Sequence, residues 1–116
     1  MKSAAECVFC RIVERRLPAD IVAEEQDVVA IKDLHPQAPT HLLLIPRAHV
    51  PTLADVTDEH TTLIGHMVQL ATRLATRLQL EAGYRLVINC GAAAGQSVWH
   101  LHIHLLGGRA LAWPPG

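Results

Sequence analysis

The stretch Trp99-His100-Leu101-His102-Ile103-His104-Leu105-Leu106 decides how this chain of 116 residues is expected to fold and what it can do. We expect a β-strand over residues 98–106, and side chains alternate between the two faces of a strand. The three histidines then share one face, with successive imidazoles about 6.6–6.8 Å apart, and the aliphatic residues that alternate with them share the other. Because the aliphatic face has to be buried, the pattern predicts three imidazoles displayed in a row on the opposite face.

This histidine face has three interpretations. One imidazole can attack an electrophile while its neighbours hold charge or move protons. Alternate histidines on a strand can instead chelate a metal ion. The third interpretation is a solvated face without chemistry, and strict alternation of three histidines beside a loop of small residues disfavours it.

The loop before the strand, Gly91-Ala92-Ala93-Ala94-Gly95-Gln96-Ser97, has the composition of an anion-binding turn. Small residues leave several backbone N–H groups exposed, and Ser97 adds a hydroxyl group. Most loops that contain glycine are only turns. This loop opens directly onto the histidine strand, which favours a phosphate cradle.

The remaining segments predict an α+β fold. Apolar residues recur every three or four positions from about residue 57 to 80, which indicates one long amphipathic helix with a stripe of Leu63, Met67, Leu70, Leu74 and Leu78. A shorter helix is expected over residues 8–17, ended by Pro18. Further strands are expected at residues 21–25, 28–32, 41–46 and 84–89, the first two as a hairpin. Two groups of strands around one long helix indicate an antiparallel sheet in a single domain, residues 1–116.

Composition restricts the partners and the compartment. Ten basic and eleven acidic residues leave a net charge of −1, so no basic stripe can neutralise a polynucleotide, whereas a small anionic ligand is compatible. No apolar run reaches the roughly 18 residues of a membrane span, so no membrane partner is expected, and residues 1–10 lack the order of a signal peptide. Three cysteines cannot all pair within the chain, which favours a reducing compartment, and we expect a cytoplasmic protein.

The histidine stretch resembles the signature of the histidine triad (HIT) family, in which a histidine alternates three times with apolar residues. Other segments are similar to the branch called histidine triad nucleotide-binding proteins, namely Asp33-Leu34, Pro36-Gln37-Ala38-Pro39-Thr40-His41, Gly95-Gln96-Ser97-Val98, Leu106-Gly107-Gly108-Arg109 and Trp113-Pro114-Pro115-Gly116. The resemblance covers almost the whole chain. It implies a HIT-like fold with a five-stranded antiparallel sheet, one long and one short helix, and a homodimer in which the two sheets join.

For activity, the resemblance implies a hydrolase that cleaves the P–N bond of purine nucleoside phosphoramidates and that also acts on aminoacyl-adenylates. His102 would attack the α-phosphorus and form a nucleotidyl-histidine intermediate, and water would release the nucleoside monophosphate without any cofactor. The residues that match the catalytic positions of the family are His102, His100, His104, His41 and Ser97. Those that match its purine nucleotide-binding positions are Asp33 for the ribose hydroxyls, Leu34, Asn89, Gly95, Gln96, Ser97, Val98, His102 and His104, with apolar walls from Val8, Phe9, Ile12, Ile31 and Leu43. Apart from the resemblance, these apolar residues would be assigned to the core.

The tail after Gly108 carries Trp113 between a glycine-ended strand and two prolines, so it cannot continue the sheet. The resemblance implies that this tail crosses the dimer interface. Trp113 would then line the leaving-group side of the partner's pocket.

Cys7 and Cys10 form a Cys-x-x-Cys pair, which is typical of half a zinc site or of two buried thiols. A redox pair is less favoured, because no thioredoxin-like βαβ pattern surrounds it. Some bacterial relatives in the family combine such cysteines with two histidines, which correspond here to His49 and His100. The resemblance therefore also implies a structural Cys₂His₂ zinc site.

Two other functions stay open. A nucleotide-binding regulatory or scaffold protein would show only incidental hydrolysis, and a metal-dependent enzyme would use the histidine triad itself as metal ligands. The presence of His102 together with Ser97 favours catalysis over binding alone, because binding requires no nucleophile.

Overall fold

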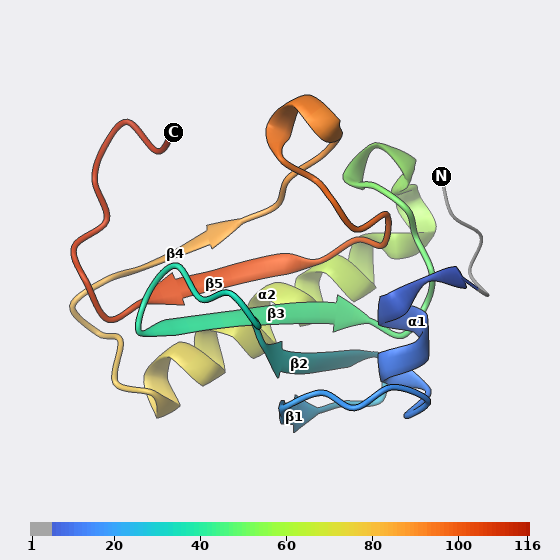
Figure 1. Cartoon of the computed structure of the whole chain (residues 1–116), viewed down its shortest axis with the longest axis horizontal. Helices are drawn as coiled ribbons and strands as arrows, with labels where there is room; N and C mark the ends of the chain where they lie inside the picture. The colour runs from blue at the N-terminus through green and yellow to red at the C-terminus, as the bar shows by residue number, and fades with distance from the viewer. Residues whose placement is uncertain (1–5) are drawn as a thin grey trace.

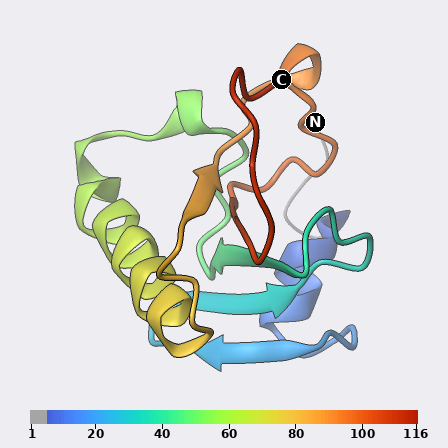
Figure 2. The same ribbon diagram turned by 90° about the vertical axis from the view of Figure 1, so that its left-hand side faces the viewer.

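An antiparallel sheet of five strands organises the structure, a computed structural model that describes residues 6–116. The strands lie in the order β1-β2-β3-β5-β4 (Figure 1). They are β1 (Ile21–Glu24), β2 (Val28–Lys32), β3 (Thr40–Pro46), β4 (Tyr84–Val87) and β5 (Ile103–Gly107). Helix α2 (Thr61–Arg77) covers one face and the short helix α1 (Val8–Val13) lies on the other (Figure 2). Short 3₁₀ turns are η2 (Leu53–Asp55), η3 (Asp58–His60) and η4 (Ala92–Ala94).

Alternation along the strands divides the core into two layers. On the α2 side, Leu101, Ile103 and Leu105 are buried in one cluster with the inner face of α2, so the prediction that they share a buried face is confirmed. On the α1 side, a second cluster joins the intervening strand residues to the helix. Its members are Cys7, Phe9, Cys10, Ile12, Val13, Val29, Ile31, Leu43 and Ile45.

The buried face of α2 is formed by leucine, methionine and alanine side chains. Met67, Leu70 and Leu74 are buried as the stripe predicts, and Leu63 is packed against the same cluster while partly exposed. Leu78 lies beyond the end of the helix and is 40% exposed, so its place in the stripe was wrong. Two alanines, Ala71 and Ala75, complete the buried face because their small side chains allow the helix to approach the sheet closely.

Both helices are shorter than their sequence patterns predict. Thr57 begins the 3₁₀ turn η3 rather than α2, and its N–H donates to His60 Nδ1 at 2.9 Å. Gln79 has a φ of 62° and ends the second helix before residue 80, and Arg15, with a φ of 61°, likewise follows the early end of α1. These left-handed residues reverse the chain where an apolar pattern alone suggests that the helix continues.

Strand β5 begins at Ile103, five residues later than predicted, because the preceding segment 98–102 has no ladder with β3. Isolated hydrogen bonds hold that segment instead, among them one from His100 Nε2 to the Pro46 carbonyl (2.8 Å) and one from the Leu101 N–H to the Val50 carbonyl (2.6 Å). His100 and His102 therefore lie before the strand, and only the last histidine of the triad belongs to it.

The other predicted elements are close to those observed. Strands β1 and β2 form the expected hairpin, and β4 ends at Val87, two residues earlier than predicted. None of the helices within residues 6–116 is both long and apolar enough to cross a membrane.

Candidate active site and metal centre

The three histidines of the triad do not form the evenly spaced, exposed row that the strand pattern predicts. His100 is 0% exposed and His102 is 8% exposed. The ring centroids of His102 and His104 are 5.1 Å apart, closer than strand spacing would place them. The irregular backbone before β5 explains the difference, because it carries His100 and His102 and turns their rings toward different partners.

His102 is oriented by the main chain. Its Nδ1 lies 2.7 Å from the carbonyl oxygen of His100, and a carbonyl can only accept, so Nδ1 carries the proton and Nε2 keeps its lone pair. The edge of the Phe9 ring packs against the imidazole at 5.1 Å. Burial lowers the pKa of His102, opposed by the hydrogen bond to His100 and by the charge of Asp33. The ring is therefore neutral near pH 7, with Nε2 available as a nucleophile.

A chain of hydrogen bonds assigns the proton of His104. The N–H of Gln37 donates to Nδ1 of His41 at 3.0 Å, so the proton of a neutral His41 is on Nε2. That Nε2 lies 2.8 Å from Nδ1 of His104, which must therefore accept. The neutral His104 ring then carries its proton on Nε2, and this N–H is a donor beside the His102 ring. Only a structure could identify Gln37 here, because it acts through its backbone.

Asp33 supplies the negative charge of the site. Its Oδ2 is 3.4 Å from His41 Nε2, and its Oδ1 accepts from the N–H of His35 at 2.8 Å. Burial lowers the pKa of His104 to about 4, assisted by its histidine neighbours and opposed by Asp33, and burial also lowers the pKa of His41. The Gln37–His41–His104 relay is thus neutral at physiological pH.

The loop 91–97 is shaped by Gln96 and two glycines. Gly91 and Gly95 have φ values of 92° and 96°, which only glycine adopts without strain. The buried amide of Gln96 accepts from the Gly91 N–H at 2.9 Å and donates to the carbonyls of Pro51 (2.9 Å) and Val98 (3.0 Å). The Gln96 side chain therefore holds the loop, while Ser97 at its end is exposed.

The predicted nucleotide-binding residues fall into three groups. Phe9, Ile12, Ile31 and Leu43 are buried in the α1-side cluster, and of these Phe9 contacts His102 directly. Leu34 projects into solvent, 88% exposed. The third group lies where loop 91–98 approaches α1. Asn89 is beside Gly95, and Val8 shares a cavity of about 70 Å³ with Ser97 and Val98.

The four predicted zinc ligands converge. Nδ1 of His100 lies 3.2 Å from Cys7 Sγ, 3.5 Å from Cys10 Sγ and 3.2 Å from His49 Nδ1, and Cys10 Sγ lies 3.2 Å from His49 Nδ1. All four donor atoms are within 4.8 Å of one another. A tetrahedral Zn²⁺ site has donor atoms about 3.3–3.8 Å apart, given Zn–N near 2.0 Å and Zn–S near 2.3 Å. These residues, which we call the Cys/His cluster, therefore fit a zinc ion.

Electrostatics and hydrogen bonding also suit a metal at the Cys/His cluster. His100 Nε2 donates to the Pro46 carbonyl at 2.8 Å, the outer contact that aims the other ring nitrogen of a metal-binding histidine at the ion. Burial, followed by the neighbouring Cys7, raises the pKa of Cys10 to about 11. The thiolate that a zinc site needs thus has to be stabilised by the cation itself.

A second set of donors, Asp33, His41 and His104, also lies within 4.8 Å but fits a metal poorly. The N–H of Gln37 occupies the lone pair of His41 Nδ1, so His41 Nε2 keeps its proton and cannot bind a cation as a neutral imidazole. The 2.8 Å contact between the two rings is a hydrogen bond. This geometry argues against the triad as a metal-chelating centre.

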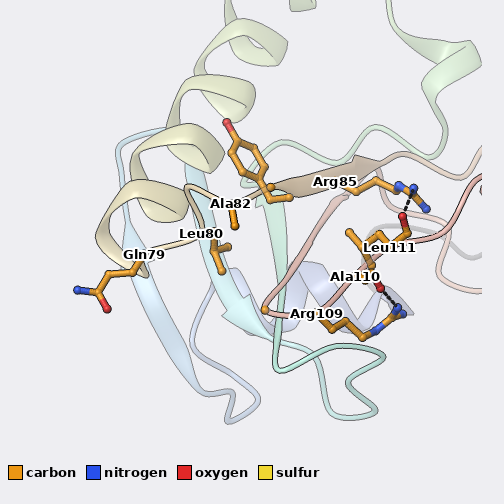
Figure 3. Close-up of a pocket in the computed structure, with 10 residues that line it drawn as sticks. Gln79, Leu80, Ala82, Arg85, Arg109, Ala110 and Leu111 are labelled. Carbon is orange, nitrogen blue, oxygen red and sulfur yellow. Dashed lines mark hydrogen bonds between the residues drawn. The ribbon is translucent and has the colours of Figure 1, made fainter.

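The C-terminal tail is held through Arg85, whose guanidinium donates to the carbonyl of Leu111 at 3.4 Å (Figure 3). It also donates to the carbonyl of Ala112 at 2.8 Å. Trp113 is 82% exposed. A neighbouring pocket of about 590 Å³ is lined by Gln79, Leu80, Ala82, Gly83, Tyr84, Arg85 and Gly108–Leu111 and contains none of the predicted site residues.

Sequence comparison agrees with this geometry. The family model described as "Scavenger mRNA decapping enzyme C-term binding" matches residues 6–111. An uncharacterized HIT-like protein of Synechococcus elongatus is 50% identical over 111 residues, which are 96% of this chain and 97% of the relative. A 14 kDa zinc-binding protein of Zea mays is 42% identical over 111 residues, which are 94% of this chain and 87% of the relative.

Solved structures agree as well. A HIT family hydrolase from Legionella pneumophila superposes with a TM-score of 0.94 at 46% identity, covering 96% of this chain and all 100% of the other. A Zn-bound histidine triad family protein from Mycobacterium smegmatis has a TM-score of 0.79 at 33% identity over 92% of this chain and 78% of its own. A histidine triad nucleotide-binding protein from Candida albicans has a TM-score of 0.80 at 27% identity over 94% and 83%. By sequence and by fold, this chain belongs to the histidine triad (HIT) family.

Proposed function

We propose that this protein is a hydrolase that cleaves the P–N bond of purine nucleoside phosphoramidates through a covalent intermediate on His102. It would also act on aminoacyl-adenylates, in which the bond broken is the P–O bond to the acyl group. One observation carries the proposal: the 2.7 Å hydrogen bond from Nδ1 of His102 to the His100 carbonyl, which leaves the Nε2 lone pair as the reactive atom. The names of similar proteins support it, since they include HIT family hydrolases and a histidine triad nucleotide-binding protein.

In the first step, His102 Nε2 forms a bond to the α-phosphorus while the P–N bond breaks, and the leaving nitrogen takes a proton from solvent water and departs as the neutral amine. In the second step, a water oxygen attacks the same phosphorus and the P–Nε2 bond breaks, which yields the nucleoside monophosphate and free His102. The Nε2–H of His104 would donate to a phosphoryl oxygen, stabilising negative charge in both steps. No cofactor is required.

Three further groups would bind the substrate. Asp33, held by the His35 N–H, would accept hydrogen bonds from the ribose hydroxyls. Backbone N–H groups of loop 91–97 and the exposed hydroxyl of Ser97 would contact the phosphate and the leaving group. Phe9 and the neighbouring aliphatic residues of the α1 side would provide the apolar wall for the purine.

The proposed assembly is a homodimer with a structural zinc ion in each subunit, located in the cytoplasm. β4 is an edge strand of the sheet, so its outer backbone groups can pair with a second copy. The geometry of the Cys/His cluster and the zinc-binding relatives support the metal. Cys7, Cys10 and Cys90 are free thiols, which suits a reducing compartment.

Trapping the intermediate tests the proposed mechanism. Alkaline denaturation of the enzyme during turnover of adenosine 5′-phosphoramidate, chosen because a P–N bond to histidine hydrolyses in acid, should give protein that is heavier by one adenylyl group. Peptide mapping at alkaline pH should locate the group on His102. A regulatory or scaffold protein would bind the nucleotide and release it unchanged. Turnover without any adenylylated protein, or with the label on another residue, would contradict the mechanism.

Replacing Trp113 with alanine should change the preference among amine leaving groups. Because this side chain is 82% exposed on its own subunit, it has little packing to lose there and is available to line the partner's pocket. The measurement is kcat/KM for substrates that share adenosine and differ in the amine, with expected changes in the ratio on the order of tenfold. The adenosine-to-guanosine ratio serves as the internal control and should not move. An equal effect on every substrate would assign Trp113 to packing.

A further inference from the structure

The Cys/His cluster and the nucleophile meet in a single residue, His100. We propose that Cys7 and Cys10 are positioning residues for His102, which act through His100 by holding the carbonyl that sets the tautomer of the nucleophile. The inference rests on the proposed function for its kinetic consequence, while its structural consequence can be observed without any substrate.

The segment that carries this carbonyl has no ladder to hold it. Residues 98–102 precede β5 and pass beside α1 and the chain that follows β3 (Figure 1). Gln96 holds its start through the Val98 carbonyl, and Leu101 holds its middle through its bond to Val50 and its buried side chain. At residue 100 itself, the polar contacts of the side chain with Pro46 and the Cys/His cluster fix the position. Outside a strand ladder, the position of a carbonyl group depends on the contacts of its own residue. The contacts of the His100 ring therefore help to determine where the His100 carbonyl oxygen lies.

Both ring nitrogens of His100 and its main-chain oxygen have polar partners. Nε2 donates to the Pro46 carbonyl at 2.8 Å, and Nδ1 faces Cys7, Cys10 and His49 at 3.2–3.5 Å. The main-chain oxygen of the same residue accepts from His102 Nδ1 at 2.7 Å. Loss of the sulfur contacts frees one side of a fully buried ring, and the backbone that carries the carbonyl can then shift.

A second connection runs through α1. Cys7 caps this helix, with its Sγ accepting from the Cys10 N–H at 3.4 Å. Phe9, between the two cysteines, packs its ring edge-on against His100 at 5.9 Å and against His102 at 5.1 Å. The cysteines thus hold both the hydrogen-bond acceptor of the nucleophile and the aromatic ring that borders it.

The cavity of about 70 Å³ beside the cluster extends this link toward the leaving group. Its lining combines Cys7 and Val8 of the α1 end with Ser97, Val98 and Trp99 of the segment that enters the triad. Asp33 and the Gln37–His41–His104 relay belong to other elements and make no contact with the cysteines among the described residues. Loss of the cluster should therefore disturb the chemical step more than ribose binding.

The direct test is the tautomer of His102 in the full-length, ¹⁵N-labelled protein, read from long-range ¹H–¹⁵N correlations of the imidazole nitrogens. The wild type should show one state, with the proton on Nδ1. The double variant Cys7→Ser/Cys10→Ser should show a mixture that includes the Nε2–H tautomer. Cys90→Ser, which removes the third, exposed cysteine, is the matched control and should give the wild-type spectrum.

Kinetics supply the second readout. In the double variant, kcat for an adenosine phosphoramidate should fall roughly 10- to 100-fold, the size of effect seen when an outer contact of a functional histidine is lost, whereas KM should change less than about threefold. Cys90→Ser should retain wild-type values. A single Nδ1–H tautomer and an unchanged kcat in the double variant would show that the cysteines only support the fold.

Should the double variant fail to fold, His49 provides the same comparison at the edge of the cluster. His49→Ala removes one ligand, and His49→Cys replaces it with another that zinc accepts. The alanine variant should show the tautomer mixture and the lower kcat, and the cysteine variant should restore a single tautomer. Identical His102 spectra in both variants and the wild type would overturn the proposal. If instead the wild type shows the expected tautomer but no hydrolysis, the proposed function fails and the positioning role stands.

Discussion

Replacing His102 with alanine is expected to reduce kcat for an adenosine phosphoramidate by a factor on the order of 10³ or more, because the covalent route loses its nucleophile. Neither of the other two triad imidazoles has a free lone pair to substitute for it. His104 Nε2 carries a proton as a consequence of the relay from Gln37, and both nitrogens of His100 are engaged by Pro46 and the Cys/His cluster. The measurement is single-turnover and steady-state hydrolysis by the metal-loaded variant.

Nucleotide binding provides the control for this substitution. Calorimetric titration with AMP should give an affinity within about tenfold of wild type, since Asp33 and loop 91–97 stay in place. The smaller variant His102→Gly should regain part of its activity when free imidazole is added, as expected if the missing group is the nucleophile. Near-normal turnover by His102→Ala would refute a nucleotidyl-histidine at this position.

Removal of the metal should produce the second large effect, on stability. The purified protein is expected to contain about one zinc ion per chain. A strong chelator should lower Tm by about 10 °C or more, which is equivalent to a loss of about 3 kcal/mol or more of unfolding free energy. The reason is that Cys7 and Cys10 at the start of α1 are joined to His49 and His100, 39 to 93 residues further along the chain, through this one site. Metal analysis and thermal unfolding measured by circular dichroism report the two quantities.

The cysteine variants distinguish a specific site from general metal binding. Cys7→Ser/Cys10→Ser should contain little zinc and should unfold at the same temperature with and without chelator. Cys90→Ser should match the wild type in zinc content and in its response to chelator, because that thiol is exposed and outside the cluster. Wild-type protein that is purified without metal and melts unchanged would eliminate the zinc site.

Much of the sheet and of the site could be predicted from local pattern. Short apolar runs bounded by turn residues located four of the five strands to within two residues, and alternation along the histidine stretch placed Leu101, Ile103 and Leu105 in the core. Spacing of the leucines located α2, although not its ends. Residue type and motif resemblance brought Cys7, Cys10, His49 and His100 into one proposed site, and the structure brings their donor atoms together. These features depend on residue type and on the spacing of apolar residues, both of which can be read directly from a sequence.

The sequence by itself determined the two faces of the sheet, the set of histidines and the pair of cysteines. Only the tertiary structure decided what each imidazole does, because tautomers depend on backbone partners that no motif names: the Gln37 N–H at His41, the Pro46 carbonyl at His100 and the His100 carbonyl at His102. Strand pattern predicted three equivalent rings on an open face. The end of the β3–β5 ladder at Ile103 breaks that equivalence. His100 and His102 lie on backbone outside the ladder, which turns His100 to the Cys/His cluster and His102 to the His100 carbonyl, whereas His104 inside the strand faces His41.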